Sequence, residues 1–288
     1  MDSILDVRML NKSYIGGFSI RDVAFFMPEG CITGFIGVNG AGKTTVIRSI
    51  LGLSARDSGQ IQFFGLDFDK NERQIKDRIG VVLDAESFYE DLSLAEMKDI
   101  IAPSYTRWSE AEFREYLDRF ELHPKQKIKL LSKGMKVKYS LALALSHKAE
   151  LLIMDEPTSG LDPLIRSQVL KILTEYMEKG GRGVLFSTHI LSDLDKITDM
   201  LVMIDNGKIV FQDEKDALLN QYRIVKGDVR QLNEPVRKLI LNIEETDYGF
   251  TGITRQISEL KQFIPDVIVE HAAIEDIMLA NIRKGGKK

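Results

Sequence analysis

The sequence lacks the features that would place it outside the cell or across a membrane. Cys31 is its only cysteine among 288 residues, which excludes an internal disulfide framework and favours a reducing compartment. Its apolar runs, such as "LALAL" and "LLIM", are far shorter than the roughly 18 residues of a membrane-spanning helix. "MDSILDVRML" has neither a basic start nor a long apolar core, so no signal peptide is expected. Any work at a membrane would therefore pass through a partner.

An excess of positive charge is also missing. The formal net charge is −4, whereas binding to nucleic acid usually needs a basic domain or stripe. The one basic cluster, "RKGGKK" at the end of the chain, is more typical of a solvated terminus than of a binding patch. A hydrophobic content of 44% and a charged content of 28% describe a soluble globular protein. At about 150 residues per domain, the length allows one large domain or two ordinary ones.

The most informative stretch is "GVNGAGKTT", residues 37–45. Its glycines let the backbone curl tightly and aim several N–H groups at anionic oxygens. Lys43 would add a positive charge for the outer phosphates, and the Thr44 hydroxyl would bind Mg²⁺. Before the loop, "CITGFIG" is apolar and rich in β-formers; after it, apolar residues recur at helical spacing. Strand, loop and helix together predict a phosphate site at a helix N-terminus, rather than a merely structural turn.

Two carboxylates follow a second buried strand. "LLIMDE" ends in Asp155 and Glu156, and ligands of a parallel sheet collect at the carboxyl ends of its strands. We therefore expect Asp155 to hold Mg²⁺, directly or through water, and Glu156 to polarise an attacking water. The alternative is that both acids simply begin a polar loop, which Pro157 and Gly160 would break. The phosphate loop upstream favours the catalytic interpretation.

A second helix end has the character of an anion site. In "LLSKGMKVKYSLALAL" Ser132 is a good N-cap, and Gly134 in the first turn lets an anionic group approach the backbone. Capping alone would explain Ser132, and both roles can hold together. Because one nucleotide needs one such helix end, two in one chain indicate two nucleotides or a site shared with a neighbouring copy.

Strand-like and helical segments alternate along most of the chain, which predicts an α/β fold with a mostly parallel sheet covered on both faces. The expected strands are 18–27, 31–38, 59–65, 79–83, 149–155, 181–188, 199–205 and 207–212. The expected helices are 43–53, 93–106, 109–120, 133–147, 162–179 and 190–196. The pattern is almost wholly helical between about 85 and 147, and it changes after about 220. We expect a nucleotide-binding domain over 1–220 with an inserted helical subdomain, and a small α+β domain over 221–288.

Taken together, "GVNGAGKTT", "LSKGM", "LLIMDEP", "SGLD" and "STH" resemble, in order and separation, the motifs of the ATP-binding subunits of ABC transporters. The resemblance covers roughly residues 3–220, and the short cassette with its small tail resembles bacterial export-type and antibiotic-resistance-type systems more than sugar importers. It implies a P-loop ABC ATPase fold, with a recombinase-like core, an antiparallel β subdomain and a helical subdomain. It also implies that two copies pair head to tail around two ATP molecules.

The resemblance implies a role for each matching position. Tyr14 would stack on adenine, and Glu156, His189 and Lys43 would carry the catalysis. Residues 37–45 resemble the Walker A loop, whose nucleotide contacts would come from Gly37, Asn39, Gly40, Ala41, Gly42, Lys43, Thr44 and Thr45. Ser132 and Gly134 resemble the signature that meets the γ-phosphate of the opposite subunit's ATP, while Asp162 matches the loop that crosses the dimer interface.

Two places depart from the family pattern. "LSKGM" stands where the family usually has LSGGQ, so Lys133 and Met135 are unusual while Ser132 and Gly134 are kept. Family members generally place a glutamine after the strand at 79–83; aligning on "IG" puts Asp84 there, a residue that is shorter and charged. Asp84 can still reach Mg²⁺ through water, so we expect the metal site to comprise Thr44, Asp155 and Asp84.

The resemblance thus predicts an ATPase that binds ATP and Mg²⁺. Its reaction cycle would consist of dimer closure followed by ATP hydrolysis. The ATPase would power separate integral membrane subunits from the cytoplasmic face of the cell membrane, as a homodimer or with a second ATPase chain, and without nucleic acid. A small-molecule P-loop kinase has no reason to carry "LSKGM" or "SGLD". A non-transport regulatory ATPase of the ABC type is the alternative. The sequence does not identify the cargo.

Overall fold

A computed structural model of the chain describes residues 3–83 and 88–282. The chain divides into two compact units, Met1–Gln212 and Asp213–Lys288. The boundary expected near residue 220 falls within helix α8 (Lys215–Gln221). Asp84 lies outside the described residues, so the structure says nothing of its expected place at the metal.

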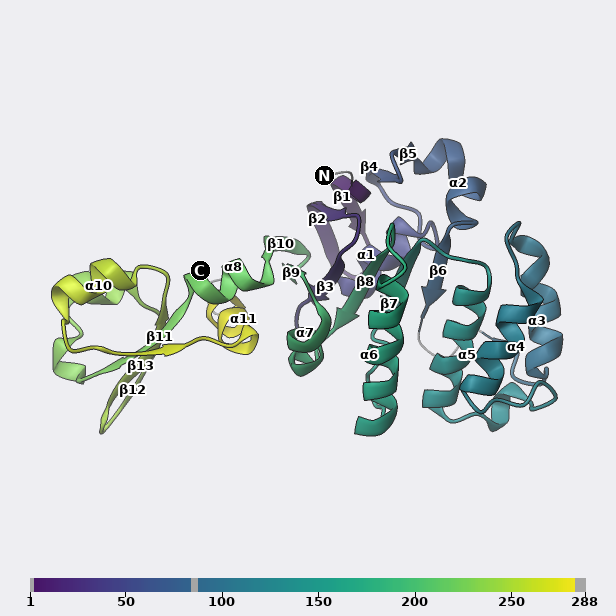
Figure 1. Cartoon of the computed structure of the whole chain (residues 1–288). Coiled ribbons are helices and arrows are strands. Elements are labelled where there is room, and N and C mark those ends of the chain that lie inside the picture. Colours follow the sequence, from purple (N-terminus) through teal and green to yellow (C-terminus); the bar gives the residue numbers. More distant parts are fainter. Residues whose placement is uncertain (1–2, 84–87, 283–288) are drawn as a thin grey trace. The chain divides into compact units, whose positions relative to one another are not determined.

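The first unit is organised around a parallel sheet (Figure 1). Its strands run in the order β10-β9-β3-β8-β7-β6, and their bounds are β3 (Ile32–Ile36), β6 (Ile79–Val82), β7 (Leu151–Asp155), β8 (Gly183–Thr188), β9 (Met200–Asp205) and β10 (Lys208–Glu214). The pairs β9–β3, β3–β8, β8–β7 and β7–β6 are all parallel. Every residue of β3, β7 and β8 is buried, as expected where both faces of a parallel sheet are covered.

The register of this sheet brings the expected motifs to one edge. Ile36 of β3 lies opposite Thr188 of β8, and Ser187 lies opposite Asp155 of β7. Because the strands are parallel, the loop after β3, the acids at the end of β7 and the residues after β8 all leave the sheet on the same side. The sheet therefore positions the functional groups that were predicted from their separate motifs.

An antiparallel sheet packs beside this core. Its order is β2-β1-β4-β5, with β1 (Ser3–Ser13), β2 (Ser19–Pro28), β4 (Ser58–Phe63) and β5 (Leu66–Asp67). Helix α1 (Lys43–Ile50) contributes Val46, Ile47 and Ile50 to one buried cluster with residues of both sheets. The sequence did not predict β1, the short β5 or the helix α2 (Phe68–Lys76) that follows β5.

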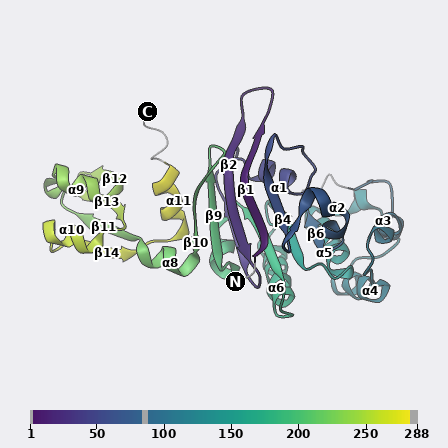
Figure 2. The same cartoon turned by 90° about the horizontal axis from the view of Figure 1, so that it is seen from above.

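Helices dominate the segment between β6 and β7. They are α3 (Leu94–Ile101), α4 (Glu110–Arg119) and α5 (Lys133–Ser146), which lie together in both views (Figure 2). Each begins at a serine N-cap whose hydroxyl accepts from a backbone N–H: Ser93, Ser109 and Ser132. Helix α5 packs against β6, which joins the helical segment to the edge of the parallel sheet. Helices α6 (Pro163–Met177) and α7 (Leu191–Ile197) complete the first unit.

The second unit has a split βαβ topology. After α8 its elements are β11 (Arg223–Gly227), α9 (Glu234–Leu239), β12 (Leu241–Thr246), β13 (Gly249–Thr254), α10 (Ile257–Phe263), β14 (Ile268–His271) and α11 (Ile274–Ile282). The sheet order is β12-β13-β11-β14 with every pair antiparallel, which is the ferredoxin-like β-α-β-β-α-β arrangement. The last of these helices, α11, buries Ile274, Ile277 and Met278.

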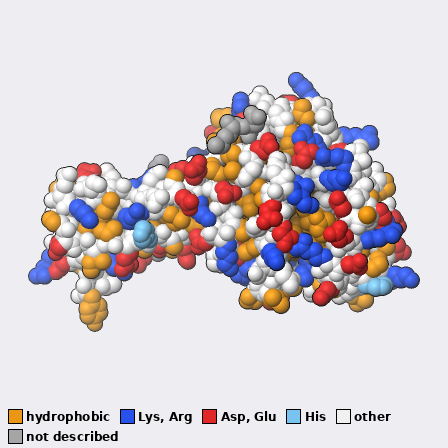
Figure 3. Space-filling model, viewed as in Figure 1, with side chains coloured by type: hydrophobic (Ala, Val, Ile, Leu, Met, Phe, Trp, Pro, Cys, Tyr) orange, Lys and Arg blue, Asp and Glu red, His pale blue; other side chains and the backbone are white. Residues whose placement is uncertain are grey.

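Surface charges of both signs are interspersed on the face shown in Figure 3, where Lys and Arg side chains do not gather into one basic surface. Over residues 3–83 and 88–282, none of the helices combines the length and the apolar character that a bilayer crossing requires.

Candidate nucleotide site

The loop after β3 is built to expose backbone N–H groups. At Gly37 the chain passes so close to β9 that a Cβ would lie 2.4 Å from the carbonyl oxygen of Ile204. Gly42 has a φ of 116° and is the N-cap of α1, where no side chain caps the helix. No acidic residue lies in the first turn of α1 either. The N–H groups of this helix end are therefore left to an external anion, which the helix dipole also favours.

Asp155 and Glu156 are held in place by Ser187, a fully buried residue of β8. The Ser187 hydroxyl donates to Asp155 Oδ1 over 2.6 Å and accepts from the Glu156 backbone N–H over 3.0 Å. Glu156 itself has a φ of +51°, a conformation that non-glycine residues rarely adopt and that often marks a functional site. The serine therefore holds the Asp155 carboxylate and the Glu156 backbone, while the side chain of Glu156 lines the cavity and that of Asp155 stays buried.

Lys43 and His189 converge on the carboxylate of Glu156. Lys43 Nζ lies 3.2 Å from Glu156 Oε1, and His189 Nδ1 lies 2.6 Å from Oε2. Lys43 Nζ also donates to the carbonyl oxygen of Gly37 over 2.8 Å. The lysine side chain is only 6% exposed and that of Glu156 only 21%, so both charges act in a partly desolvated setting where electrostatic interactions are strong.

These groups line one cavity of about 480 Å³. Eight of the residues predicted for nucleotide binding or catalysis form much of its wall: Asn39, Gly40, Gly42, Lys43, Thr44, Thr45, Glu156 and His189. Three further residues were not predicted as part of it: Phe18, Lys133 and Ser159. Lys133 had a sequence signal, because it replaces a usual glycine of the family. Ser159 lies within "TSGLD". Phe18 had no sequence signal beyond its place near Tyr14.

Tyr14 does not line this cavity. It lies just beyond the end of β1, where its hydroxyl is 3.3 Å from Ser54 Oγ and its ring lies under the ammonium of Lys12 at 5.4 Å. Phe18, at the other end of the same turn, is the aromatic residue that borders the cavity, since a Cβ on Gly42 would meet its Cζ at 3.2 Å. The hairpin thus places the ring of Phe18 beside Gly42 of the nucleotide loop.

The remaining predicted residues have local structural partners. Ser132 caps α5 by accepting from the Met135 N–H over 3.3 Å, and Asp162 caps α6 by accepting from the N–H groups of Leu164 and Ile165, each over 3.0 Å. Gly134 allows α5 to approach α6, because a Cβ there would lie 2.9 Å from Ile165 Cγ2. Gly37 and Ala41 belong to the phosphate loop but do not line the cavity. The same is true of Ser132, Gly134 and Asp162 in their own chain.

The donor set suits Mg²⁺ in part. Among the described residues, no three His, Cys, Asp or Glu side chains form a metal-binding group. Thr44 is exposed at the start of α1 and lines the cavity, and Asp155 is 7% exposed at the edge of the sheet. One hydroxyl and one carboxylate fit an ion that keeps several waters and takes further oxygens from phosphates.

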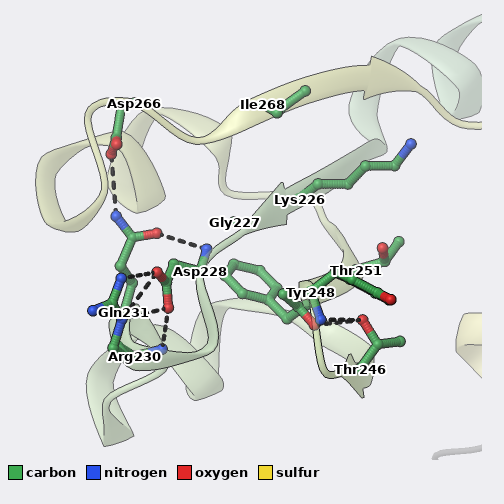
Figure 4. Close-up of a pocket in the computed structure, with 12 residues that line it drawn as sticks. Lys226, Gly227, Asp228, Arg230, Gln231, Thr246, Tyr248, Thr251, Asp266 and Ile268 are labelled. Atoms are coloured by element: carbon green, nitrogen blue, oxygen red, sulfur yellow. Dashed lines mark hydrogen bonds and ion pairs between the residues drawn. The ribbon is translucent and has the colours of Figure 1, made fainter.

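A second hollow, of about 830 Å³, lies in the C-terminal unit (Figure 4). Its polar groups are already bonded to one another: Gln231 Nε2 donates to Asp266, Gln231 Oε1 accepts from the Asp228 N–H, and Asp228 pairs with Arg230. Lys226 pairs with Glu270. This hollow has no glycine-rich loop at a helix N-terminus and no cation without a carboxylate partner, so its chemistry does not match that of a nucleotide site.

Comparison with known proteins agrees with this geometry. The profile of the family described as "ABC transporter" matches residues 20–159. The bacitracin transport ATP-binding protein BcrA of Bacillus licheniformis is 34% identical over 270 residues, covering 91% of this chain and 87% of that protein. The lantibiotic transport ATP-binding protein SrtF of Streptococcus pyogenes is 32% identical over 228 residues, covering 78% and 97%. A solved ATP-binding subunit of an ABC transporter is 32% identical with a TM-score of 0.68, covering 76% of this chain and 92% of its own.

Proposed function

This chain belongs to the ABC transporter family and is an ATP-binding, ATP-hydrolysing subunit that powers a separate membrane partner; from that premise we propose how its residues divide the work. The observation that carries the proposal is the convergence of Lys43 and His189 on the two carboxylate oxygens of Glu156, beside a helix end that lacks a cap. The alternative of a non-transport ATPase is not favoured, because the relatives are named for transport.

Lys43 and the N–H groups of the loop bind the triphosphate, and Glu156 serves as the general base. A γ-phosphoryl group that enters against Lys43 competes with Glu156 for the ammonium. The Glu156 carboxylate is then available to orient a water for in-line attack, while His189 stabilises the charge that develops on the phosphoryl oxygens. Because Lys43 and Glu156 are mostly shielded from solvent, these interactions are stronger than they would be in water.

Mg²⁺ bound by Thr44 and, through water, by Asp155 would supply charge neutralisation at the β- and γ-phosphates. Ser187 holds Asp155 in position for this, because its hydroxyl donates to Oδ1 over 2.6 Å. Asp84, which would complete the set, lies outside the described residues.

Two protomers complete each site. Ser132 accepts the Met135 N–H within its own chain, but a hydroxyl that accepts one bond still has a proton to donate. Gly134 keeps the first turn of α5 free of a Cβ. We propose that this helix end and the loop capped by Asp162 face the nucleotide of the opposite protomer, so that MgATP closes the dimer and hydrolysis reopens it.

The subunit is proposed to work at the cytoplasmic face of the cell membrane, bound to integral membrane subunits. The relatives are named for bacitracin and lantibiotic transport, so we propose compounds of these kinds as the cargo of the partner. Deleting the gene and measuring the inhibitory concentrations of bacitracin and of a lantibiotic would test the proposed cargo alone. Unchanged inhibitory concentrations of both compounds would contradict this proposal.

The Glu156→Gln variant tests the catalytic assignment. The amide keeps the shape of the side chain but is a poor base, so ATP binding should persist while turnover falls by about 10²–10⁴-fold. Glu178→Gln, which changes an exposed glutamate beyond α6, is the matched control and should hydrolyse ATP normally. Turnover by Glu156→Gln at the wild-type rate would show that another group is the base.

A further inference from the structure

A buried ion pair that the proposed mechanism does not use lies between helices α6 and α7. Nε of Arg166 on α6 is 3.9 Å from Oδ2 of Asp193 on α7, and the Asp193 side chain is 0% exposed. In the part of the chain that the structure describes, Asp193 has no other cation within ion-pair distance. The Arg166 guanidinium is therefore the charge that compensates this buried carboxylate.

Hydrogen bonding does not explain why these charges are buried. Among the described residues, neither carboxylate oxygen of Asp193 has a hydrogen-bond partner, and neither does Nε of Arg166. Asp193 lies in the first turn of α7, where an acidic side chain can accept from the free N–H groups of a helix, but its oxygens accept from none of them. Apolar side chains of similar volume would stabilise such a contact as well or better, so the two charges point to a role in positioning.

Each partner follows a residue of the proposed site by four positions. Asp193 follows His189, and α7 begins at Leu191, just after that histidine. Arg166 follows Asp162, the N-cap of α6, and the Arg166 N–H donates to the Asp162 carbonyl oxygen over 3.0 Å. The ion pair thus joins the first helical turn after His189 to the first helical turn after Asp162.

The placement of His189 depends on the turn that follows it. Its Nδ1 lies 2.6 Å from Glu156 Oε2, although the histidine side chain is 41% exposed and so has few neighbours to fix it. Two contacts fix the next turn. Leu194 packs against β3, since a Cβ on Gly34 would lie 2.7 Å from its Cδ2, and Asp193 pairs with α6. Loss of the second contact would leave α7 free to shift along the sheet and to carry the histidine with it.

We propose that Asp193 and Arg166 are positioning residues for ATP hydrolysis, because their ion pair fixes the turn after His189 and so keeps the imidazole where it acts on the γ-phosphoryl group. This rests on the proposed function, in which His189 stabilises charge on the phosphoryl oxygens. Neither Asp193 nor Arg166 lines the nucleotide cavity, so neither contributes to ATP binding. Misplacing a catalytic group by about 1 Å can cost about 10²-fold in rate, so the loss appears in kcat.

The first comparison measures steady-state ATPase activity in variants of the full chain. Asp193→Asn removes the charge at nearly constant volume, and Arg166→Gln removes the other partner. Asp195→Asn is the matched control, because Asp195 is an exposed acid on the same helix. Each sample is assayed at a concentration where light scattering with MgATP gives the mass of two chains, and circular dichroism reports folding.

We expect Asp193→Asn and Arg166→Gln each to lower kcat by about tenfold, while KM for ATP changes by less than about twofold. Asp195→Asn should match the wild type in both. If only one of the two pair variants folds, its kcat decides.

The second comparison shows whether the ion pair acts through His189. In a chain that already carries His189→Ala, Asp193→Asn should lower the residual kcat no further, because no imidazole remains to be positioned. A role confined to packing or to the dimer interface would lower kcat equally in both backgrounds.

Two results would overturn the inference. One is wild-type kcat in a folded variant of the pair, and the other is an equal loss of kcat from Asp193→Asn with and without His189. Failure of the proposed function looks different, because His189→Ala alone would then hydrolyse ATP at the wild-type rate.

Discussion

Acid should destabilise the packing of the helical segment against the parallel sheet, because a buried histidine lies at the end of α5. His147 follows the last turn of α5 and is 1% exposed. Its ring stacks on Tyr105 with centroids 3.7 Å apart and planes 10° apart. Burial lowers the pKa of His147 from 6.5 to about 4, while the nearby Asp77 carboxylate and the Arg107 guanidinium act in opposite directions with smaller effects. The folded protein therefore holds this imidazole neutral.

The sign and size of the effect follow from this pKa. Below pH 6.5 the unfolded chain takes up a proton at His147 that the folded chain takes up only near pH 4, so the free energy of unfolding falls as the pH drops through that window. The difference of 2.5 pKa units corresponds to about 3 kcal/mol in full, of which about 2 kcal/mol is lost by pH 5.

Urea unfolding, followed by Trp108 fluorescence, would measure this loss of unfolding free energy at low pH. Trp108 is the only tryptophan, and its ring lies 5.4 Å from that of Phe113 in the helical segment. The quantity of interest is the difference in unfolding free energy between wild type and His147→Leu at pH 7.5, 6 and 5. Taking the difference cancels the titration of other groups. His123→Gln is the control, because His123 is exposed.

The wild type should lose about 2 kcal/mol relative to His147→Leu between pH 7.5 and pH 5, and His123→Gln should follow the wild type throughout. A difference between wild type and His147→Leu that stays constant with pH would refute the reasoning, since it would mean that His147 has the same pKa in the folded and unfolded chain.

Three further outcomes follow from the site and the division of the chain. Ser187→Ala should lower both kcat and the free energy of unfolding, the latter by about 2 kcal/mol, because the buried Asp155 carboxylate loses a hydrogen-bond donor. Urea unfolding and a steady-state ATPase assay measure the two effects, and no change in either would show that the serine is unimportant. Calorimetry with ATP should show weaker binding by both Tyr14→Ala and Phe18→Ala if both rings contact adenine. A variant that binds ATP with wild-type affinity would show that its ring is not part of the site. A chain ending at residue 221 should bind ATP if the second unit only supports or regulates the first, and loss of ATP binding by a folded truncation would contradict that role.

The strand, loop and helix around the phosphate site could be predicted because local signals agree there. Gly37 and Gly42 mark the loop, and the apolar residues on either side follow the strand and helix periods. The placement of Asp155 and Glu156 at the same edge followed from a general property of parallel sheets. The structure has β3, β8 and β7 side by side and parallel, which is why the two motifs meet.

Other features depend on contacts that no local pattern encodes. Strand β1 was missed because Met9 has a φ of 50° and the register shifts between Val7 and Leu10, so the two-residue alternation breaks. Helix α2 was missed because it is highly charged, buries only Phe68 and Ile75, and has a non-helical Asn71 inside. The contact of Ser187 with Asp155 depends on strand register, and that of Lys133 with the cavity depends on how α5 packs on α6. The order of strands in the C-terminal unit is likewise a long-range property.

The central claim is that two protomers share each ATP site, and specific ATPase activity across a dilution series tests it most directly. Light scattering gives the mass in each sample, against 32.6 kDa for one chain. The account predicts that activity per chain rises with concentration as the mass with MgATP approaches twice that value, and that Ser132→Arg abolishes turnover while a single chain still binds ATP. A constant activity per chain from a species that keeps the mass of one chain throughout would contradict it.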